Sequence, residues 1–201
     1  MTYKKLKYLF YIFCFSFLLT GCSFFPSTLE KNENTWADSG SITVGNMLTV
    51  QNTDDRLALI NHMDTLSADG LYYASWAMGS PEPFQNSAGD MIDLYDAQFY
   101  LLLGEFPDDE SAKGAMGKWL AAGKANYDIL SEEEIICNGQ PYTFITYQRA
   151  HDDIPYHRGV SAFGQFHNYA VCIELTCKED FEEDLTALMN DFLNACSYKK
   201  Q

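Results

Sequence analysis

The chain has 201 residues and a formal net charge of −15, from 28 acidic and 13 basic side chains. This length allows one domain with a sizeable core, and the 47% of hydrophobic and 15% of aromatic residues exclude a disordered chain. The acidic balance argues against nucleic acid as a partner, because a phosphate-binding face needs clustered lysine and arginine.

The first 21 residues have the layout of a secretory signal peptide. Lysines at positions 4, 5 and 7 precede an apolar run from Tyr8 to Leu19. A comfortable bilayer span takes about 20 residues, so this run is too short, and small residues follow it. We expect residues 1–21 to be removed, which changes the net charge from −15 to −18 because the leader carries three lysines and no acid.

The end of this leader, Leu19-Thr20-Gly21-Cys22, resembles the lipobox of bacterial lipoproteins. The resemblance implies that Cys22 is diacylated and becomes the first mature residue. It also implies a lipid-anchored protein on the bacterial cell membrane, facing outside the cytoplasm. Residues 22–41 are polar and are expected to form a flexible tether to a single globular α/β domain over residues 42–201.

Four strands are predicted between the tether and the first helix. The β-branched alternation of Ile42–Val50 predicts the first strand, and alternating leucines favour a second strand over Asp54–Ile60. Leu71–Met78 has the composition of a buried strand. Proline and glycine predict a loop over Gly79–Gly89, and the apolar stretch within Ile92–Glu105 predicts a strand that is buried on both faces.

The rest of the chain predicts two helices and two hairpins. Acidic residues after Pro107 indicate a helix start, since carboxylates are favoured at the positive end of the helix dipole, and the helix is expected to end near Gly123. Asn138-Gly139 is a strong hairpin-turn signal, and His167-Asn168 predicts a second hairpin. Thr176-Cys177-Lys178-Glu179 fits a capping box for an amphipathic helix that reaches Cys196.

This order of elements predicts an α/β (α+β) fold in which two amphipathic helices flank a mainly antiparallel sheet. It resembles the Mog1/PsbP-like fold, a small α/β/α sandwich found in several bacterial lipoproteins. The resemblance covers roughly residues 42–198. It implies a protein that binds partners or accompanies membrane complexes, and it carries over no functional residue.

Four cysteines remain in the predicted domain, at positions 137, 172, 177 and 196. Export permits disulfides, and a bridge needs Cα atoms within about 7 Å. One pair, Cys137 and Cys196, is not excluded by distance, because the strand that ends at Cys137 and the helix that ends at Cys196 are expected to finish at the same end of the sheet. The alternative is that all four are buried, reduced thiols.

Residues 151–157 hold the residue types of a metal site. Imidazole and carboxylate groups bind zinc and other divalent ions, so the candidate ligands are His151, Asp152, Asp153 and His157. No known spacing motif matches them. The alternative is a polar hairpin loop in which the two aspartates make turn contacts.

Aromatic residues in the strand Leu71–Met78 are the candidate binding residues: Tyr72, Tyr73 and Trp76. Tyrosine and tryptophan are over-represented at interfaces, so one face of this strand could line a groove for a ligand or a partner. The alternative is that these side chains belong to the core.

Two functions are compatible with these patterns. The first is a membrane-anchored extracytoplasmic lipoprotein that acts as a non-enzymatic binding or accessory module for a protein partner or a small ligand, without a cofactor. The second is a metal-dependent hydrolase that uses the loop from His151 to His157. The sequence has no Gly-x-Ser-x-Gly elbow and no glycine-rich phosphate-binding loop, which favours the first function.

Overall fold

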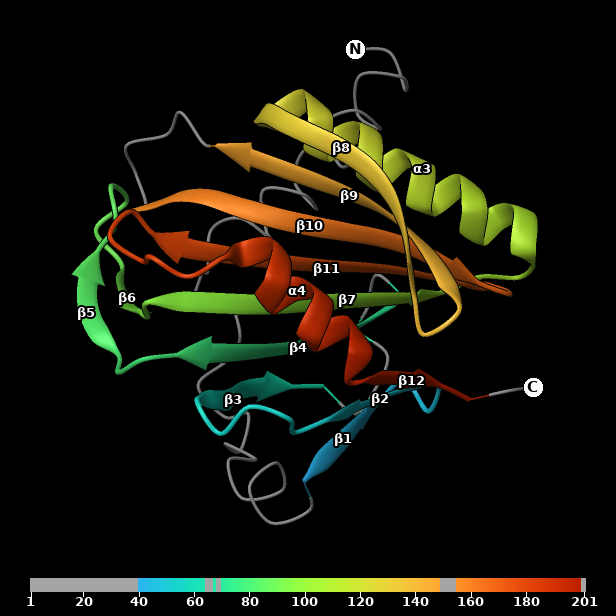
Figure 1. The fold of residues 1–201 in the computed structure, drawn as a ribbon, viewed down its shortest axis with the longest axis horizontal. Coiled ribbons are helices and arrows are strands. Elements are labelled where there is room, and N and C mark those ends of the chain that lie inside the picture. The colour runs from blue at the N-terminus through green and yellow to red at the C-terminus, as the bar shows by residue number, and fades with distance from the viewer. Residues whose placement is uncertain (1–39, 64–66, 68–69, 149–154, 200–201) are drawn as a thin grey trace.

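The computed structural model describes residues 40–63, 67, 70–148 and 155–199. Within these ranges a seven-stranded antiparallel sheet forms the centre of the molecule (Figure 1). Its strands, in spatial order, are β3 (Leu57–His62), β4 (Leu71–Met78), β7 (Ala97–Glu105), β11 (Tyr169–Lys178), β10 (Tyr156–Phe166), β9 (Gln140–Gln148) and β8 (Asp128–Cys137). A three-stranded sheet consists of β1 (Ser41–Val44), β2 (Leu48–Gln51) and β12 (Cys196–Tyr198). A two-stranded sheet consists of β5 (Glu82–Gln85) and β6 (Met91–Leu94).

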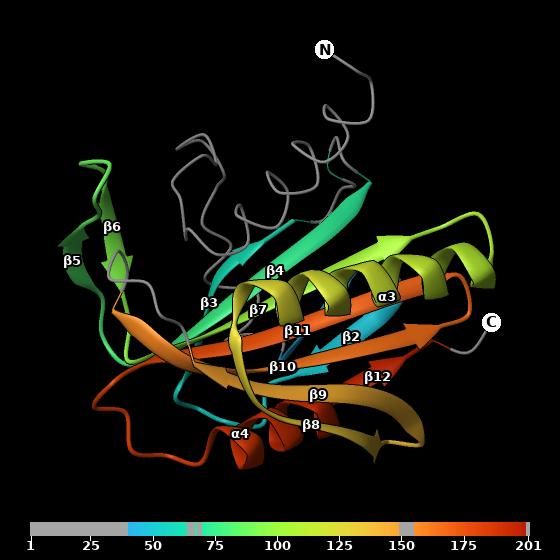
Figure 2. The ribbon, with the colours of Figure 1, turned by 90° about the horizontal axis from the view of Figure 1, so that it is seen from above.

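Two helices, α3 (Asp109–Asn126) and α4 (Leu185–Asn194), pack on opposite faces of the seven-stranded sheet (Figures 1 and 2). The central strand β11 contributes side chains to the hydrophobic clusters on both faces of the sheet. Ile173 and Leu175 belong to the core that contains the buried residues of α4, whereas Cys172 lies in the cluster against which α3 packs. The predicted α+β fold, a mainly antiparallel sheet with two helices, is confirmed in these coarse terms. No helix within the described ranges is long and apolar enough to cross a bilayer.

The first helix begins where the sequence predicts and ends later. The Asp108 side chain is the N-cap and accepts a hydrogen bond from the Ser111 amide at 2.7 Å, which lowers the pKa of the Asp108 carboxyl. The expected end at Gly123 is wrong, because α3 continues to Asn126. Gly123 faces the sheet instead, where an added Cβ would lie 3.4 Å from Ile145. The glycine thus allows a close approach of helix and sheet.

The second helix begins later than the predicted capping box. Thr176 and Cys177 continue strand β11, where they are buried and paired with β7 and β10, so they are not free to cap a helix. The N-cap is Asp184, whose Oδ1 accepts from the amides of Thr186 at 2.9 Å and Ala187 at 3.1 Å. The expected helix end at Cys196 is also wrong, because α4 ends at Asn194 and β12 follows.

The predicted first strand, Ile42–Val50, is a hairpin. Gly45 and Asn46 have φ of 59° and 54°, the left-handed conformation of a tight hairpin turn, and β1 and β2 pair on either side of them. An added Cβ on Gly45 would lie 2.7 Å from the Tyr72 ring, so glycine is also required by packing. The Gly-Asn dipeptide is a turn signal, but the strand-like alternation of the residues around it led to the prediction of one continuous strand.

The predicted strand Ile92–Glu105 is broken into β6 and β7 at Tyr95. The Tyr156 hydroxyl accepts from the Tyr95 amide at 2.9 Å and donates to the Tyr95 carbonyl at 3.1 Å, which satisfies the backbone at the break. The predicted loop Gly79–Gly89 contains β5, which pairs with β6, so seven strands rather than four precede α3. Both predicted hairpins in the C-terminal third are confirmed.

Candidate functional site

The predicted aromatic binding residues lie on both faces of β4. Trp76 is fully buried and packs edge-on against Phe192, with ring centroids 5.0 Å apart, so it belongs to the core rather than to a surface. Tyr72 is half-buried against the turn at Gly45, and Tyr73 packs against the cluster on the other face. The structure therefore does not gather these three side chains at one site.

The predicted metal ligands are only partly within the described ranges. His157 is half-buried in β10, whereas His151, Asp152 and Asp153 lie outside the described residues. Within the described part of the chain, no group of three or more histidine, cysteine or acidic side chains could hold a metal ion. The metal loop remains a prediction.

All four cysteines of the domain are buried free thiols in the structure. Cys137 donates to the Asn194 side-chain oxygen at 3.0 Å, and Cys196 donates to the Phe192 carbonyl at 3.3 Å. Both thiols therefore lie at the C-terminal end of α4. Burial raises the pKa of each thiol, which favours the protonated form. A Cys137–Cys196 disulfide stays a prediction for the oxidised protein.

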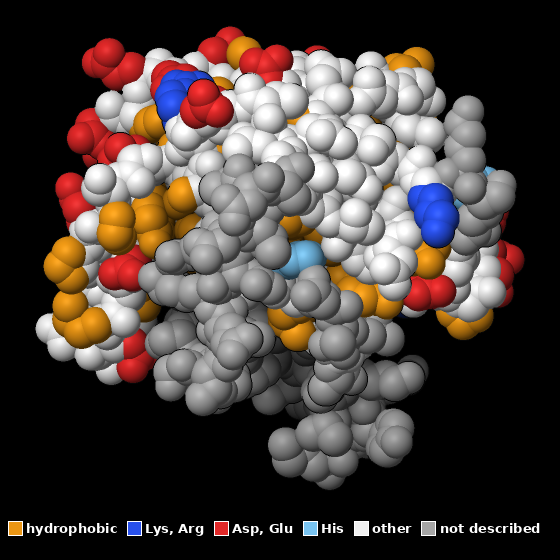
Figure 3. All heavy atoms as spheres, turned by 90° about the horizontal axis from the view of Figure 1, so that it is seen from below, with side chains coloured by type: hydrophobic (Ala, Val, Ile, Leu, Met, Phe, Trp, Pro, Cys, Tyr) orange, Lys and Arg blue, Asp and Glu red, His pale blue; other side chains and the backbone are white. Residues whose placement is uncertain are grey.

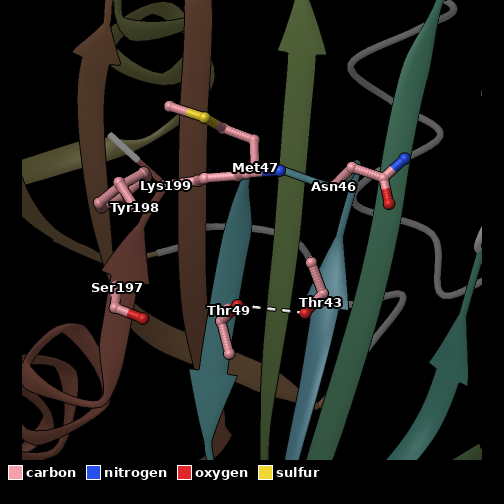
Figure 4. Close-up of a pocket in the computed structure, with 7 residues that line it drawn as sticks. All are labelled: Thr43, Asn46, Met47, Thr49, Ser197, Tyr198 and Lys199. Carbon is pink, nitrogen blue, oxygen red and sulfur yellow. Dashed lines mark hydrogen bonds between the residues drawn. The ribbon is translucent and has the colours of Figure 1, made fainter. Parts of the chain in front are cut away.

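The described residues form a hollow of about 720 Å³ on the three-stranded sheet (Figure 4). Thr43, Thr49 and Ser197 lie side by side on β1, β2 and β12, and the hydroxyls of the two threonines are 3.1 Å apart. The remaining lining residues are Asn46, Met47, Tyr198 and Lys199. Lys199 is the only charged residue among these seven, on a chain whose net charge is −15.

Strand alternation positions the hydroxyl row of this hollow. Ile42, Val44, Leu48 and Val50 point into the core, so the threonines between them face outward. In the view from below, most of the visible acidic side chains lie toward the edges of the face (Figure 3). The strand on which Ser197 lies, β12, was not predicted from the sequence.

The core holds β12 in place beside β2. The Tyr198 hydroxyl is 2.5 Å from the Tyr142 hydroxyl, and burial raises the pKa of both phenols. The Asn138 side chain donates to the carbonyls of Asn194 at 2.9 Å and Cys196 at 3.0 Å. One wall of the hollow is therefore fixed by contacts to the β8–β9 hairpin.

A buried carboxylate on the α3 side of the sheet is the other polar feature that sequence reasoning missed. Glu174 is 7% exposed, and its Oε1 accepts hydrogen bonds from the hydroxyls of Tyr127, at 2.9 Å, and Tyr147. The two phenol rings stack with centroids 4.0 Å apart. The hydrogen bonds from the two hydroxyls offset the free-energy cost of burying the carboxylate, and they join the C-terminal end of α3 to β9 and β11. In the sequence, the signal for this buried carboxylate was a single acidic residue within a largely apolar strand.

The comparisons with known proteins include a weak structural resemblance. No family model matches the chain, and no curated protein matches it. The fold is similar to the solution structure of cyanobacterial PsbP (CyanoP) from Synechocystis sp. PCC 6803, with a TM-score of 0.39 and 13% sequence identity. That alignment covers 66% of this chain and 89% of the cyanobacterial chain.

Proposed function

We propose that this chain is a lipoprotein anchored through Cys22 on the outer side of a bacterial cell membrane, where it acts as a non-enzymatic binding or accessory module. The proposal includes removal of residues 1–21, a tether over residues 22–41 and one domain over residues 42–201. It also includes the α/β/α sandwich of the Mog1/PsbP-like fold as the finer fold class. The lipobox supports the anchor, and the packing of α3 and α4 on opposite faces supports the sandwich.

The hollow on the three-stranded sheet carries the binding role. Its volume of about 720 Å³ is within the range of ligand sites, about 300–1,000 Å³. The hydroxyls of Thr43, Thr49 and Ser197 can donate and accept hydrogen bonds, and Lys199 supplies one positive charge. Because no lining residue is acidic, the hollow can accept a neutral polar group, and it can also accept an anionic group, which the acidic remainder of the surface would repel.

The anchor is tested by replacing the cysteine that would carry the lipid. Cys22→Ala should leave an uncleaved precursor without acyl label, because diacylation needs that thiol. Cys14→Ala is the matched control, since this cysteine lies within the leader and the variant should be processed and labelled like the wild type. Metabolic labelling with a radioactive fatty acid, followed by electrophoresis, measures both. Normal labelling of Cys22→Ala would show that the lipoprotein assignment is wrong.

The binding role is tested by placing a photoreactive amino acid in the hollow. Benzoylphenylalanine at position 49 of the full chain should give a discrete adduct when intact cells are irradiated. The same amino acid in place of Met91, which is 60% exposed on β6, should not give that adduct. Ser197→Arg should reduce the adduct by filling the hollow. Absence of an adduct at position 49, or identical adducts from both positions, would contradict the proposal.

A further inference from the structure

Strand β8 is a long outer edge of the seven-stranded sheet. Among the described strands it pairs only with β9, so no described strand pairs with the backbone on its other side (Figure 1). Leu130 is 62% exposed and Ile136 is 80% exposed. Within the described residues only Met91 is another large apolar side chain with comparable exposure. An exposed edge strand with apolar side chains is the surface to which a further strand can add.

The centre of this edge is acidic on both faces. Glu132 and Glu134 are in register with Ile145 and Thr143, whereas Glu133 is in register with Phe144. Ile145 belongs to the cluster on the α3 side and Phe144 to the core on the α4 side, so the carboxylates alternate between the two faces. Lys124 pairs with Glu132 at 2.5 Å, and the Thr143 hydroxyl donates to Glu134 at 2.6 Å. Glu133 is the acid of these three on the opposite face, in register with Phe144.

A second copy of the chain fits this edge poorly. If β8 strands of two copies paired antiparallel, with Leu130 of one copy opposite Ile136 of the other, Glu133 of each copy would lie opposite Glu133 of the other. This pairing would therefore set the three glutamates of one copy against the same three of the other. Like charges directly opposite each other in a ladder are destabilising. The occupant that matches the edge is a strand with basic side chains.

We propose that β8 is a docking strand for an extended segment of a protein partner that carries lysine or arginine at alternating positions. The segment adds as an eighth strand of the sheet. Backbone hydrogen bonds to β8 hold it, its basic side chains lie on the same face as Glu133, and its apolar side chains lie on the opposite face beside Ile136. This surface is on a different sheet from the hollow and does not depend on it.

The test measures binding of a labelled synthetic peptide to the full chain in detergent micelles by fluorescence anisotropy. The probe is a seven-residue peptide that alternates lysine and valine. A second peptide has the same side chains with N-methyl groups on the amides of one edge, and should bind at least about tenfold more weakly because it cannot complete the ladder. A third peptide, with glutamate in place of lysine, should not bind.

Variants of the protein separate this edge from general attraction to an acidic chain. Glu133→Lys should weaken binding of the basic peptide at least about fivefold. Asp93→Lys on the exposed side of β6 makes the same change in net charge and should alter it by less than about twofold, because distant surface charges are screened. Ile136→Thr keeps a β-branched residue and should weaken binding about threefold. Unchanged thermal unfolding of each variant checks the fold.

Three results would overturn the proposal. The first is equal binding of the N-methylated peptide, which would indicate charge attraction without strand addition. The second is equal weakening by Glu133→Lys and Asp93→Lys. The third is a dimer in sedimentation experiments that Ile136→Thr dissociates, which would make a second copy the occupant of β8.

Discussion

Phe192→Ala is expected to lower the free energy of unfolding by about 3–5 kcal/mol, since truncating a buried phenylalanine loses transfer energy and leaves a cavity. The Phe192 ring stacks on Phe99 at 4.5 Å and meets the edge of Trp76 at 5.0 Å. It therefore joins α4 to β4 and β7 at the centre of the core. Chemical denaturation of the purified protein, followed by tryptophan fluorescence, measures the change because Trp76 reports on this contact.

The neighbouring residue supplies the control for this prediction. Asp191 is exposed on the same helix, so Asp191→Ala should change the free energy of unfolding by less than about 0.5 kcal/mol. A loss below about 1 kcal/mol for Phe192→Ala would mean that α4 contributes little to the core, which would contradict the packing described above.

Glu174→Leu is expected to lower the free energy of unfolding by about 2–4 kcal/mol. The substitution removes the carboxylate that accepts from Tyr127 and Tyr147, and each buried donor that loses its acceptor costs about 1–3 kcal/mol. Glu174→Gln keeps an acceptor oxygen at the same place and should cost less. Urea denaturation of both variants at neutral pH measures the difference.

A triple-mutant cycle distinguishes this hydrogen-bond effect from a change in packing. Combining Glu174→Leu with Tyr127→Phe and Tyr147→Phe removes the donors together with the acceptor. Replacing all partners by apolar groups of similar shape can be nearly neutral, so the combined variant should regain part of the lost stability. If the three substitutions destabilise additively, the phenols do not depend on Glu174.

The two proposed contact surfaces lie on different sheets, and the β8–β9 turn contacts β12 through Asn138. In Figure 1 the three-stranded sheet with the hollow is near the bottom, and β8 begins near the top and descends toward β12. Strand β1 begins at Ser41, where the proposed tether ends, so the hollow lies on the sheet that is joined first to the anchor. A lipid-anchored module with this geometry could contact a polar ligand through one sheet and a basic protein segment through the other.

The sequence alone determined those elements whose causes are local. The Asn138-Gly139 turn has φ of 50° and 74°, a conformation that this dipeptide adopts at low cost, so the hairpin was predictable. The start of α3 was predictable for the same reason, because the Asp108 cap and the acids after it act within one helical turn. Strand β4 was predicted with its observed bounds, Leu71–Met78, because its composition and length are those of a buried strand.

Only the tertiary structure decided which distant segments meet. The sequence predicts a helix that reaches Cys196, but Cys196–Tyr198 becomes β12 because β2, far away in the chain, offers it a pairing edge. Ser197 joins the hydroxyls of Thr43 and Thr49 only through that pairing, so the hollow had no sequence signature. The partners of Glu174 are likewise remote in the sequence. A local pattern records which face a side chain occupies, whereas pairing between distant strands and helices determines what that side chain contacts.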